Sequence, residues 1–226
     1  MPDITAPELA ELLGVTRRHA TDLLSDGAIQ GRRLPSGAWL VDSDSALRFQ
    51  ASARTGKGRQ LTPDSAWALL WELSGMRAEW LTPRTSARTR ERIRTLSADQ
   101  IARAVASRTR AHHFRAANVA KASSDLISTG RAAAGALGVD LMDDTRNVSG
   151  YVRRGTASDH AADNFMVAAR DGRDLLWDNT LPIDYGDTVM PVAVIAADLA
   201  VSTDTRERSG GLRALDDLRR RWLDSH

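Results

Sequence analysis

The 226-residue sequence predicts an α+β protein, with two helices and a β-hairpin at the N-terminus, further helices, and then a mixed α/β domain. Three observations predict this. Residues 4–49 contain helix-capping residues and two short apolar runs. Apolar residues recur at helical spacing in 61–110. In 111–226, strand-like runs alternate with helical ones. We expect domains at 1–50 and 111–226, joined by a basic linker (51–60) and a helical, Arg-rich connecting region (61–110).

The first helix is predicted to begin at about Ala6. Thr5 can accept hydrogen bonds from free N–H groups of the first turn, Pro7 suits that turn, and Glu8 stands where a capping box requires it. Gly14 can adopt the left-handed conformation that ends a helix. The apolar face consists of Leu9, Leu12 and Leu13.

A second helix is predicted from Thr16, its capping residue, to Gly27. Ala20, Leu23 and Leu24 fall on its inner face. The outer face carries Arg17, Arg18, His19, Thr21 and Asp22. Polar and cationic groups are therefore expected at the solvent side of this helix.

A hairpin is predicted after the second helix. Residues 32–34 and 39–41 are two short strand-like runs, separated by the turn residues Pro35, Ser36 and Gly37. A further capped helix is expected from Ser43.

This order of elements resembles the MerR-like and excisionase-like winged helix-turn-helix family, over about one-fifth of the chain. In that family the start of the second helix enters the DNA major groove and the hairpin, or wing, lies along the neighbouring backbone. The resemblance implies DNA contacts by Thr16, Arg17, Arg18 and Thr21, and by Arg32 and Arg33 of the wing. Asp22 departs from the family pattern, and a helix-turn-helix used only for protein contact is the alternative.

Charge is distributed unevenly along the chain. Residues 76–121 hold eleven Lys or Arg against three acidic residues, whereas 122–226 hold twelve against seventeen. This asymmetry favours nucleic acid as the partner of the front part and a different partner for the rear. The sequence has no cysteine and no apolar run of about 20 residues, so we expect a cytoplasmic protein with no membrane association.

Two further cationic segments could contact DNA phosphates. Arg54, Lys57 and Arg59 lie in the small, Gly-containing linker. Residues 84–94 form the densest cationic segment, in which Arg88 and Arg92 are candidates for a second DNA surface or for a face presented to an acidic partner. Helices are expected from Thr62-Pro63 to Ser74, and from the cap Ser97 to Val105.

The second half is predicted to mix strands and helices. Strands are expected at 113–116 and 150–152, and a hairpin is expected between 165–168 and 175–177 around Asp171-Gly172. Residues 124–137 are expected to form a helix broken by Gly130 and Gly135. Residues 192–201 predict a buried helix and 205–222 an amphipathic one.

Several segments in order resemble actinobacterial helix-turn-helix proteins similar to AbiEi-type antitoxins of type IV toxin-antitoxin systems. These segments are LTPDSAWALLWELSG, WLTPRTSARTRERIR and VMPVAVIAADLAVSTDTRERSGGLRALDDL. The resemblance implies a transcriptional repressor that binds its own operator in double-stranded DNA as a possible homodimer. It further implies a C-terminal domain that neutralises a nucleotidyltransferase toxin.

No pattern in the sequence predicts a catalytic, metal or cofactor site. Adjacent His112 and His113 would point to opposite faces of a strand, which prevents them from sharing a metal. The carboxylates of Asp143-Asp144 and of 184–187 stand among turn residues, and phosphate-loop, dinucleotide-binding and GxSxG signatures are absent. We therefore expect a non-enzyme. Two alternatives stay open: a stand-alone regulator whose C-terminal domain dimerises or senses a ligand, and a magnesium-dependent nucleic-acid enzyme using the Asp-rich loops.

Overall fold

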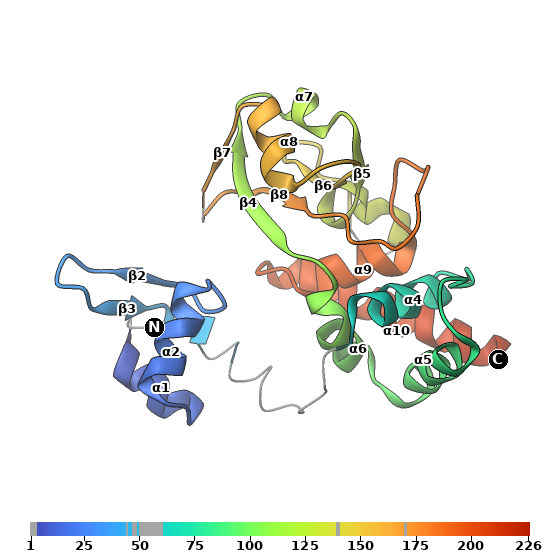
Figure 1. The fold of residues 1–226 in the computed structure, drawn as a ribbon, viewed down its shortest axis with the longest axis horizontal. Helices are drawn as coiled ribbons and strands as arrows, with labels where there is room; N and C mark the ends of the chain where they lie inside the picture. The colour runs from blue at the N-terminus through green and yellow to red at the C-terminus, as the bar shows by residue number, and fades with distance from the viewer. Residues whose placement is uncertain (1–3, 44, 47–48, 50–60, 139–140, 170) are drawn as a thin grey trace. The chain divides into compact units, whose positions relative to one another are not determined.

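The computed structural model describes residues 4–43, 45–46, 49, 61–138, 141–169 and 171–226 (Figure 1). The chain divides into two compact units, Met1–Lys57 and Gly58–His226, called here the N-terminal and C-terminal units. Both strands and helices are present, so the protein is of the mixed α+β class, as predicted. Each unit is described by itself.

The N-terminal unit consists of two short helices and a three-stranded antiparallel sheet. Its elements are β1 (Ile4–Thr5), α1 (Ala6–Leu13), α2 (Arg17–Ser25), β2 (Gly31–Arg33) and β3 (Trp39–Val41), with strand order β1-β3-β2. The predicted capping box between Thr5 and Glu8 is present, and Gly14 ends α1 with φ 66°. The sequence did not predict β1, which pairs with β3 and ties the start of α1 to the hairpin. The expected helix from Ser43 lies partly outside the described residues. Its described residues Ser43, Ser45, Ala46 and Phe49 are helical.

One small hydrophobic core holds the N-terminal unit together. It buries apolar side chains from both helices and from the hairpin: Leu9, Ala10, Ala20, Leu24, Ile29, Val41 and Ala46. Ala20 is fully buried where α2 meets α1, and its small side chain allows the two helices to approach closely. The apolar face of α2 is thereby fixed inward, and its polar face is left to solvent.

The C-terminal unit is built on a five-stranded sheet, with strand order β5-β6-β8-β4-β7. Among the strand pairs that the structure describes in this sheet, β6 and β8 are parallel and the others are antiparallel. The strands are β4 (Ala111–Ala116), β5 (Leu126–Ser128), β6 (Ser149–Val152), β7 (Met166–Ala168) and β8 (Asp174–Trp177). The helices are α4 (Pro63–Leu73), α5 (Pro83–Thr95), α6 (Ala98–Val105), α7 (Val119–Ser123), α8 (Ala157–Asp163), α9 (Val192–Ala200) and α10 (Thr205–Ser225), with 3-10 segments η1 (Ala106–Arg108) and η2 (Gly130–Leu137).

Helices cover both faces of this sheet (Figure 1). Successive residues of a strand point to opposite faces, so Ile127, Tyr151 and Trp177 pack against the larger helical layer that includes α4, α6, α9 and α10. Their neighbours Leu126, Val152 and Leu176 pack on the other face, against α7 and α8. Helices of the 61–110 region thus share one continuous core with the sheet.

The predicted hairpin between 165–168 and 175–177 is wrong. β7 and β8 form as strands, but each pairs with an opposite edge of β4, which lies between them. The connection crosses β4 at Gly172, where an added Cβ would lie 2.1 Å from the carbonyl oxygen of Phe114. Asp171-Gly172 therefore marks a close crossing over a neighbouring strand, and the local turn signal could not distinguish it from a hairpin.

The predicted broken helix at 124–137 is also wrong in its first part. Residues 126–128 form β5 and pair with β6, and only Gly130–Leu137 is helical, in 3-10 form. Asp125 adopts a left-handed φ of 64° that turns the chain into β5. Pairing with β6, a contact distant in sequence, decides this conformation over local helix propensity.

Candidate nucleic-acid interface

The first turn of α2 presents cationic side chains to solvent. Thr16 is the N-cap, with its hydroxyl oxygen accepting from the backbone N–H of His19 at 3.3 Å. Arg17 and Arg18 follow directly and are both exposed, while Ala20 and Leu24 on the opposite face are buried. The positive end of the helix dipole adds to these two cations, which makes the start of α2 a favourable place for an anion.

Two other residues of α2, Thr21 and Asp22, also contribute to this surface. Thr21 is half-buried and donates its hydroxyl to the carbonyl oxygen of Arg17 at 2.9 Å, so its methyl group is left for contacts. Asp22 is exposed, and in the described part of the chain it forms no ion pair with Arg18. The helix surface therefore combines two cations with one carboxylate a turn further on.

The hairpin adds a second pair of cations. Arg32 pairs with Leu40 and Arg33 with Trp39, and both arginines are exposed. Because adjacent residues of a strand alternate faces, the two side chains leave opposite sides of the ribbon. The Nε of Arg33 donates to the carbonyl oxygen of Gly37 at 3.3 Å, which fixes this arginine against the turn.

The remaining predicted contacts lie elsewhere in the chain. Arg54, Lys57 and Arg59 fall outside the described residues. Arg88 and Arg92 lie on α5 of the C-terminal unit, where Arg88 is exposed and Arg92 is half-buried. On the same helix Arg90 forms an ion pair with Glu72 at 3.3 Å, and Arg94 lies 5.5 Å from the ring centroid of Trp222.

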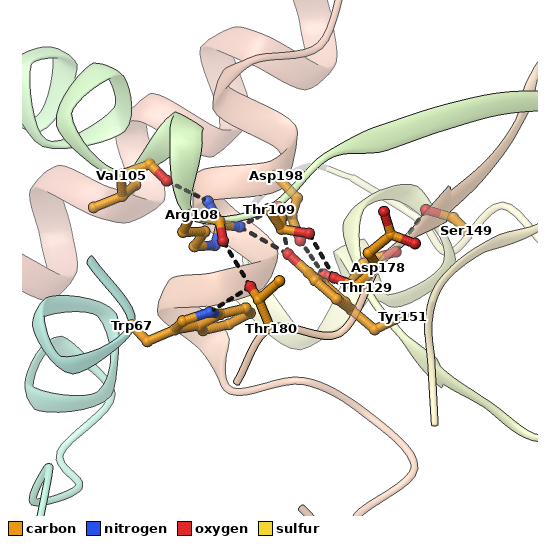
Figure 2. Close-up of polar contacts among 10 residues, drawn as sticks. All are labelled: Trp67, Val105, Arg108, Thr109, Thr129, Ser149, Tyr151, Asp178, Thr180 and Asp198. Atoms are coloured by element: carbon orange, nitrogen blue, oxygen red, sulfur yellow. Dashed lines mark hydrogen bonds and ion pairs between the residues drawn. The ribbon is translucent and has the colours of Figure 1, made fainter. Parts of the chain in front are cut away.

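Sequence reasoning missed a buried polar cluster in the C-terminal unit (Figure 2). Arg108 and Asp198 form an ion pair with side chains 3% and 2% exposed. Arg108 also donates to the phenol oxygen of Tyr151 at 3.0 Å, and Thr129 donates to Asp198 at 2.6 Å. The signal in the sequence was Asp198 itself, a single carboxylate in the otherwise apolar VAVIAADLA of α9.

Burial governs the ionisation of this cluster. Burial raises the pKa of Tyr151 well above its ordinary value, so the phenol stays protonated. Burial also raises the pKa of Asp198, against the opposing effects of Arg108 and the hydroxyl donors. For Arg108, the neighbouring Tyr151 and Asp198 outweigh burial and raise the pKa.

The position of the cluster points to a structural role. Its members come from η1, β6, α9 and the residue that follows β5, so it connects the sheet to the helical layer. Arg108, Thr129, Tyr151 and Asp198 are each 6% exposed or less, which leaves no surface for a substrate. The guanidinium also lies 5.2 Å from the ring centroid of Trp67, whose indole N–H donates to Thr180 at 3.0 Å.

The two histidines and the carboxylates considered for chemistry have separate partners. His112 bonds through Nε2 to Asp178 at 2.8 Å, and Nδ1 of His113 lies 3.0 Å from the carbonyl oxygen of Gly172 on the other face. Asp143 accepts from the backbone N–H of Gly135 at 2.7 Å, and Asp184 is exposed. Among the described residues, no three His, Asp or Glu side chains come together to hold a metal ion.

A half-open cavity of about 300 Å³ lies between η2, α9 and α10. Its walls are mostly apolar, with Leu137, Val192 and Leu218, and two charged residues of α10, Asp217 and Arg221, also line it. The carboxylate of Asp217 pairs with neighbouring Arg220. The cavity thus offers an apolar recess beside one helix, without a convergent set of polar groups.

Comparison of this chain with protein-family models, with curated proteins and with solved structures found no match. Among the helices in the described part of the chain, none is both long enough and apolar enough to cross a membrane.

Proposed function

We propose that this chain is a DNA-binding protein whose N-terminal unit is a winged helix-turn-helix, with α2 as the recognition helix. The observation that carries the proposal is the two-sided character of α2. Ala20 and Leu24 fix one face in the core, while Arg17 and Arg18 stand exposed in the first turn. An α-helix fits the major groove, where Arg reads guanine through paired hydrogen bonds or binds phosphate.

The hairpin supports the same geometry. Arg32 is exposed on a short ribbon that follows α2 in the chain, and it suits contact with the phosphate backbone beside the groove. Thr16 holds the helix start in place through its cap, so its substitution acts on helix geometry as well as on DNA contact. Arg17 and Arg18 then supply base or phosphate contacts, and Arg32 supplies charge.

Within this class, the particular function that we propose is a sequence-specific, cytoplasmic transcriptional repressor that binds its own operator. We further propose that it is the antitoxin of a type IV pair with a nucleotidyltransferase toxin. The antitoxin role is supported by the order and the amino-acid sequence of the segments quoted above. The C-terminal unit is the part assigned to neutralising the toxin. The protein is proposed to act by binding rather than by catalysis.

The test is a gel-shift or anisotropy titration of the purified chain on its own upstream DNA, over a series of salt concentrations. If Arg18 reads a base, Arg18→Ala weakens operator binding by about 1–3 kcal/mol and reduces the preference for operator over random duplex. Arg32→Ala weakens all sequences alike and lowers the salt slope by about one, because one phosphate contact is lost.

Arg154→Ala is the matched control, since this exposed arginine belongs to the C-terminal unit. Its affinity is expected to equal that of the unchanged chain. Unchanged binding by the Arg17→Ala, Arg18→Ala double variant would remove α2 from the interface and overturn the proposal. For the antitoxin role, a variant whose C-terminal unit is inactivated and whose N-terminal unit is intact should still repress its operator. It should fail to protect cells that produce the toxin encoded beside it.

A further inference from the structure

The edge strand β7 of the C-terminal unit carries two unusual features. β7 is the last strand of the sheet, next to β4, and its sequence Met166-Val167-Ala168 has neither charge nor proline. Val167 at its centre is 66% exposed, and Phe165 just before it is 75% exposed. Natural edge strands are commonly protected by charges, prolines, bulges or short length. β7 has no charge, proline or bulge, and its length of three residues is the one such protection it has.

Phe165 is also held in a strained conformation. Its φ is 53°, in the left-handed region, at a helix end where glycine is the usual residue. A side chain with a Cβ is sterically disfavoured there. Lys121 lies 5.1 Å from the ring centroid, yet most of the ring is open to solvent. Fold stability does not account for a strained and exposed aromatic residue beside an open strand edge, which is the kind of observation that points to a contact surface.

The hydrogen-bond register of β7 shows which of its backbone groups are free. Val167 pairs with Arg115 of β4, and the N–H of Ala169 donates to the carbonyl oxygen of His113. In an antiparallel ladder the bonded residues alternate, so 167 and 169 face β4. The N–H and C=O groups of Met166 and Ala168 therefore point outward, on either side of Val167.

We propose that β7 pairs antiparallel with β7 of a second copy of this chain, about a two-fold axis through Val167. In that register each Met166 faces Ala168 of the other copy, and the two residues exchange both backbone hydrogen bonds, four in all. The two Val167 side chains meet at the non-hydrogen-bonded position, where cross-strand side chains are closest. Phe165 of one copy comes opposite the small Ala169 of the other.

The symmetry of the free groups argues for a second copy over a foreign strand. The outward donors and acceptors are arranged equally about one exposed valine, so the segment is its own complement in both hydrogen bonding and apolar contact. β7 itself brings no charge to the pair. The charges beside it in the described residues have both signs: Lys121 over the Phe165 ring, Arg115 of β4, and Asp171, which pairs with Arg115. A three-residue strand supports a weak dimer that forms as concentration rises. This inference stands independently of the proposed DNA function.

The absence of cysteine from the chain makes a direct test available. In a non-hydrogen-bonded antiparallel pair the Cα atoms are about 4.5 Å apart, within the range that a disulfide spans. Val167→Cys should therefore form a disulfide-linked dimer under mild oxidation. Val201→Cys is the control, because Val201 is 52% exposed but follows α9 and is not part of β7.

The expected result is cross-linking of Val167→Cys at least about tenfold faster than Val201→Cys at equal concentration, since a preformed pair raises the effective thiol concentration. Sedimentation of the unchanged chain should approach twice the 24.6 kDa of one copy at high concentration. Val167→Lys should abolish that rise, whereas Val167→Thr, which keeps β-branching, should retain it. Equal cross-linking rates for the two cysteine variants, or a monomer at all concentrations, would overturn the proposal.

Discussion

The buried ion pair between Arg108 and Asp198 makes an asymmetric prediction about stability. Asp198→Leu leaves the Arg108 guanidinium inside the core without an anion, and arginine cannot lose its proton. Breaking a buried pair in this way costs about 3–5 kcal/mol. Tyr151 and Thr129 also lose the carboxylate that accepts their hydroxyl protons, which places the cost at the upper part of this range.

The opposite substitution, Arg108→Met, should reduce the free energy of unfolding less than Asp198→Leu does at low pH. The buried carboxyl of Asp198 can take up a proton, and loss of the cation moves its pKa further in the direction in which burial already raises it. A carboxyl with a folded-state pKa above its unfolded value binds more protons when folded. Arg108→Met should therefore be most stable below the ordinary pKa of Asp, about 4, and should lose stability as the pH rises from there to the raised folded-state pKa.

Removing both charges should recover much of the loss. The double variant Arg108→Met, Asp198→Leu should be at least about 2 kcal/mol more stable than Asp198→Leu alone, because no charge remains buried. Urea unfolding followed by tryptophan fluorescence measures this, since Trp67, Trp71, Trp80, Trp177 and Trp222 lie in the C-terminal unit and only Trp39 lies outside it. A cost below about 1 kcal/mol for Asp198→Leu, or no recovery in the double variant, would refute the reasoning.

Three further predictions concern other parts of the C-terminal unit. Gly211→Ala should destabilise it by about 1–3 kcal/mol in urea unfolding, because a Cβ there would lie 2.5 Å from the backbone nitrogen of Ala200; Gly210→Ala, which meets only the flexible side chain of Leu141, should cost less. Asp204→Ala should remove the cap of α10 and cost about 1 kcal/mol. Backbone N–H groups, first that of Glu207, lower the pKa of Asp204. The stability difference between the unchanged chain and Asp204→Ala should therefore be largest above the ordinary pKa of Asp, and should be lost as the pH falls through the folded-state pKa. Burial and Asp187 raise the pKa of Tyr185 to about 12, so ultraviolet titration should detect no phenolate at pH 10.

Local chemistry determined the two helices and the hairpin of the N-terminal unit. The cap and capping box at Thr5 and Glu8, the left-handed Gly14 and the turn at 35–37 act within a few residues of one another, so the sequence predicted both helices and the hairpin close to their observed bounds. The exposure of Arg17 and Arg18 followed from the same periodicity, because a helix with one apolar face must turn its other face to solvent.

Only the tertiary structure decided the strand order of the C-terminal unit and the conformation of residues 126–128. The order of its strands places β4 between β7 and β8, and pairing with β6 makes residues 126–128 a strand, both through contacts between residues far apart in the chain. The ion pair of Arg108 and Asp198 joins positions 90 residues apart, and the outer edge of β7 is open because, among the described strands, β7 pairs with β4 alone. Sequence periodicity reports which face of an element is apolar, but the partner of that face is fixed by long-range packing.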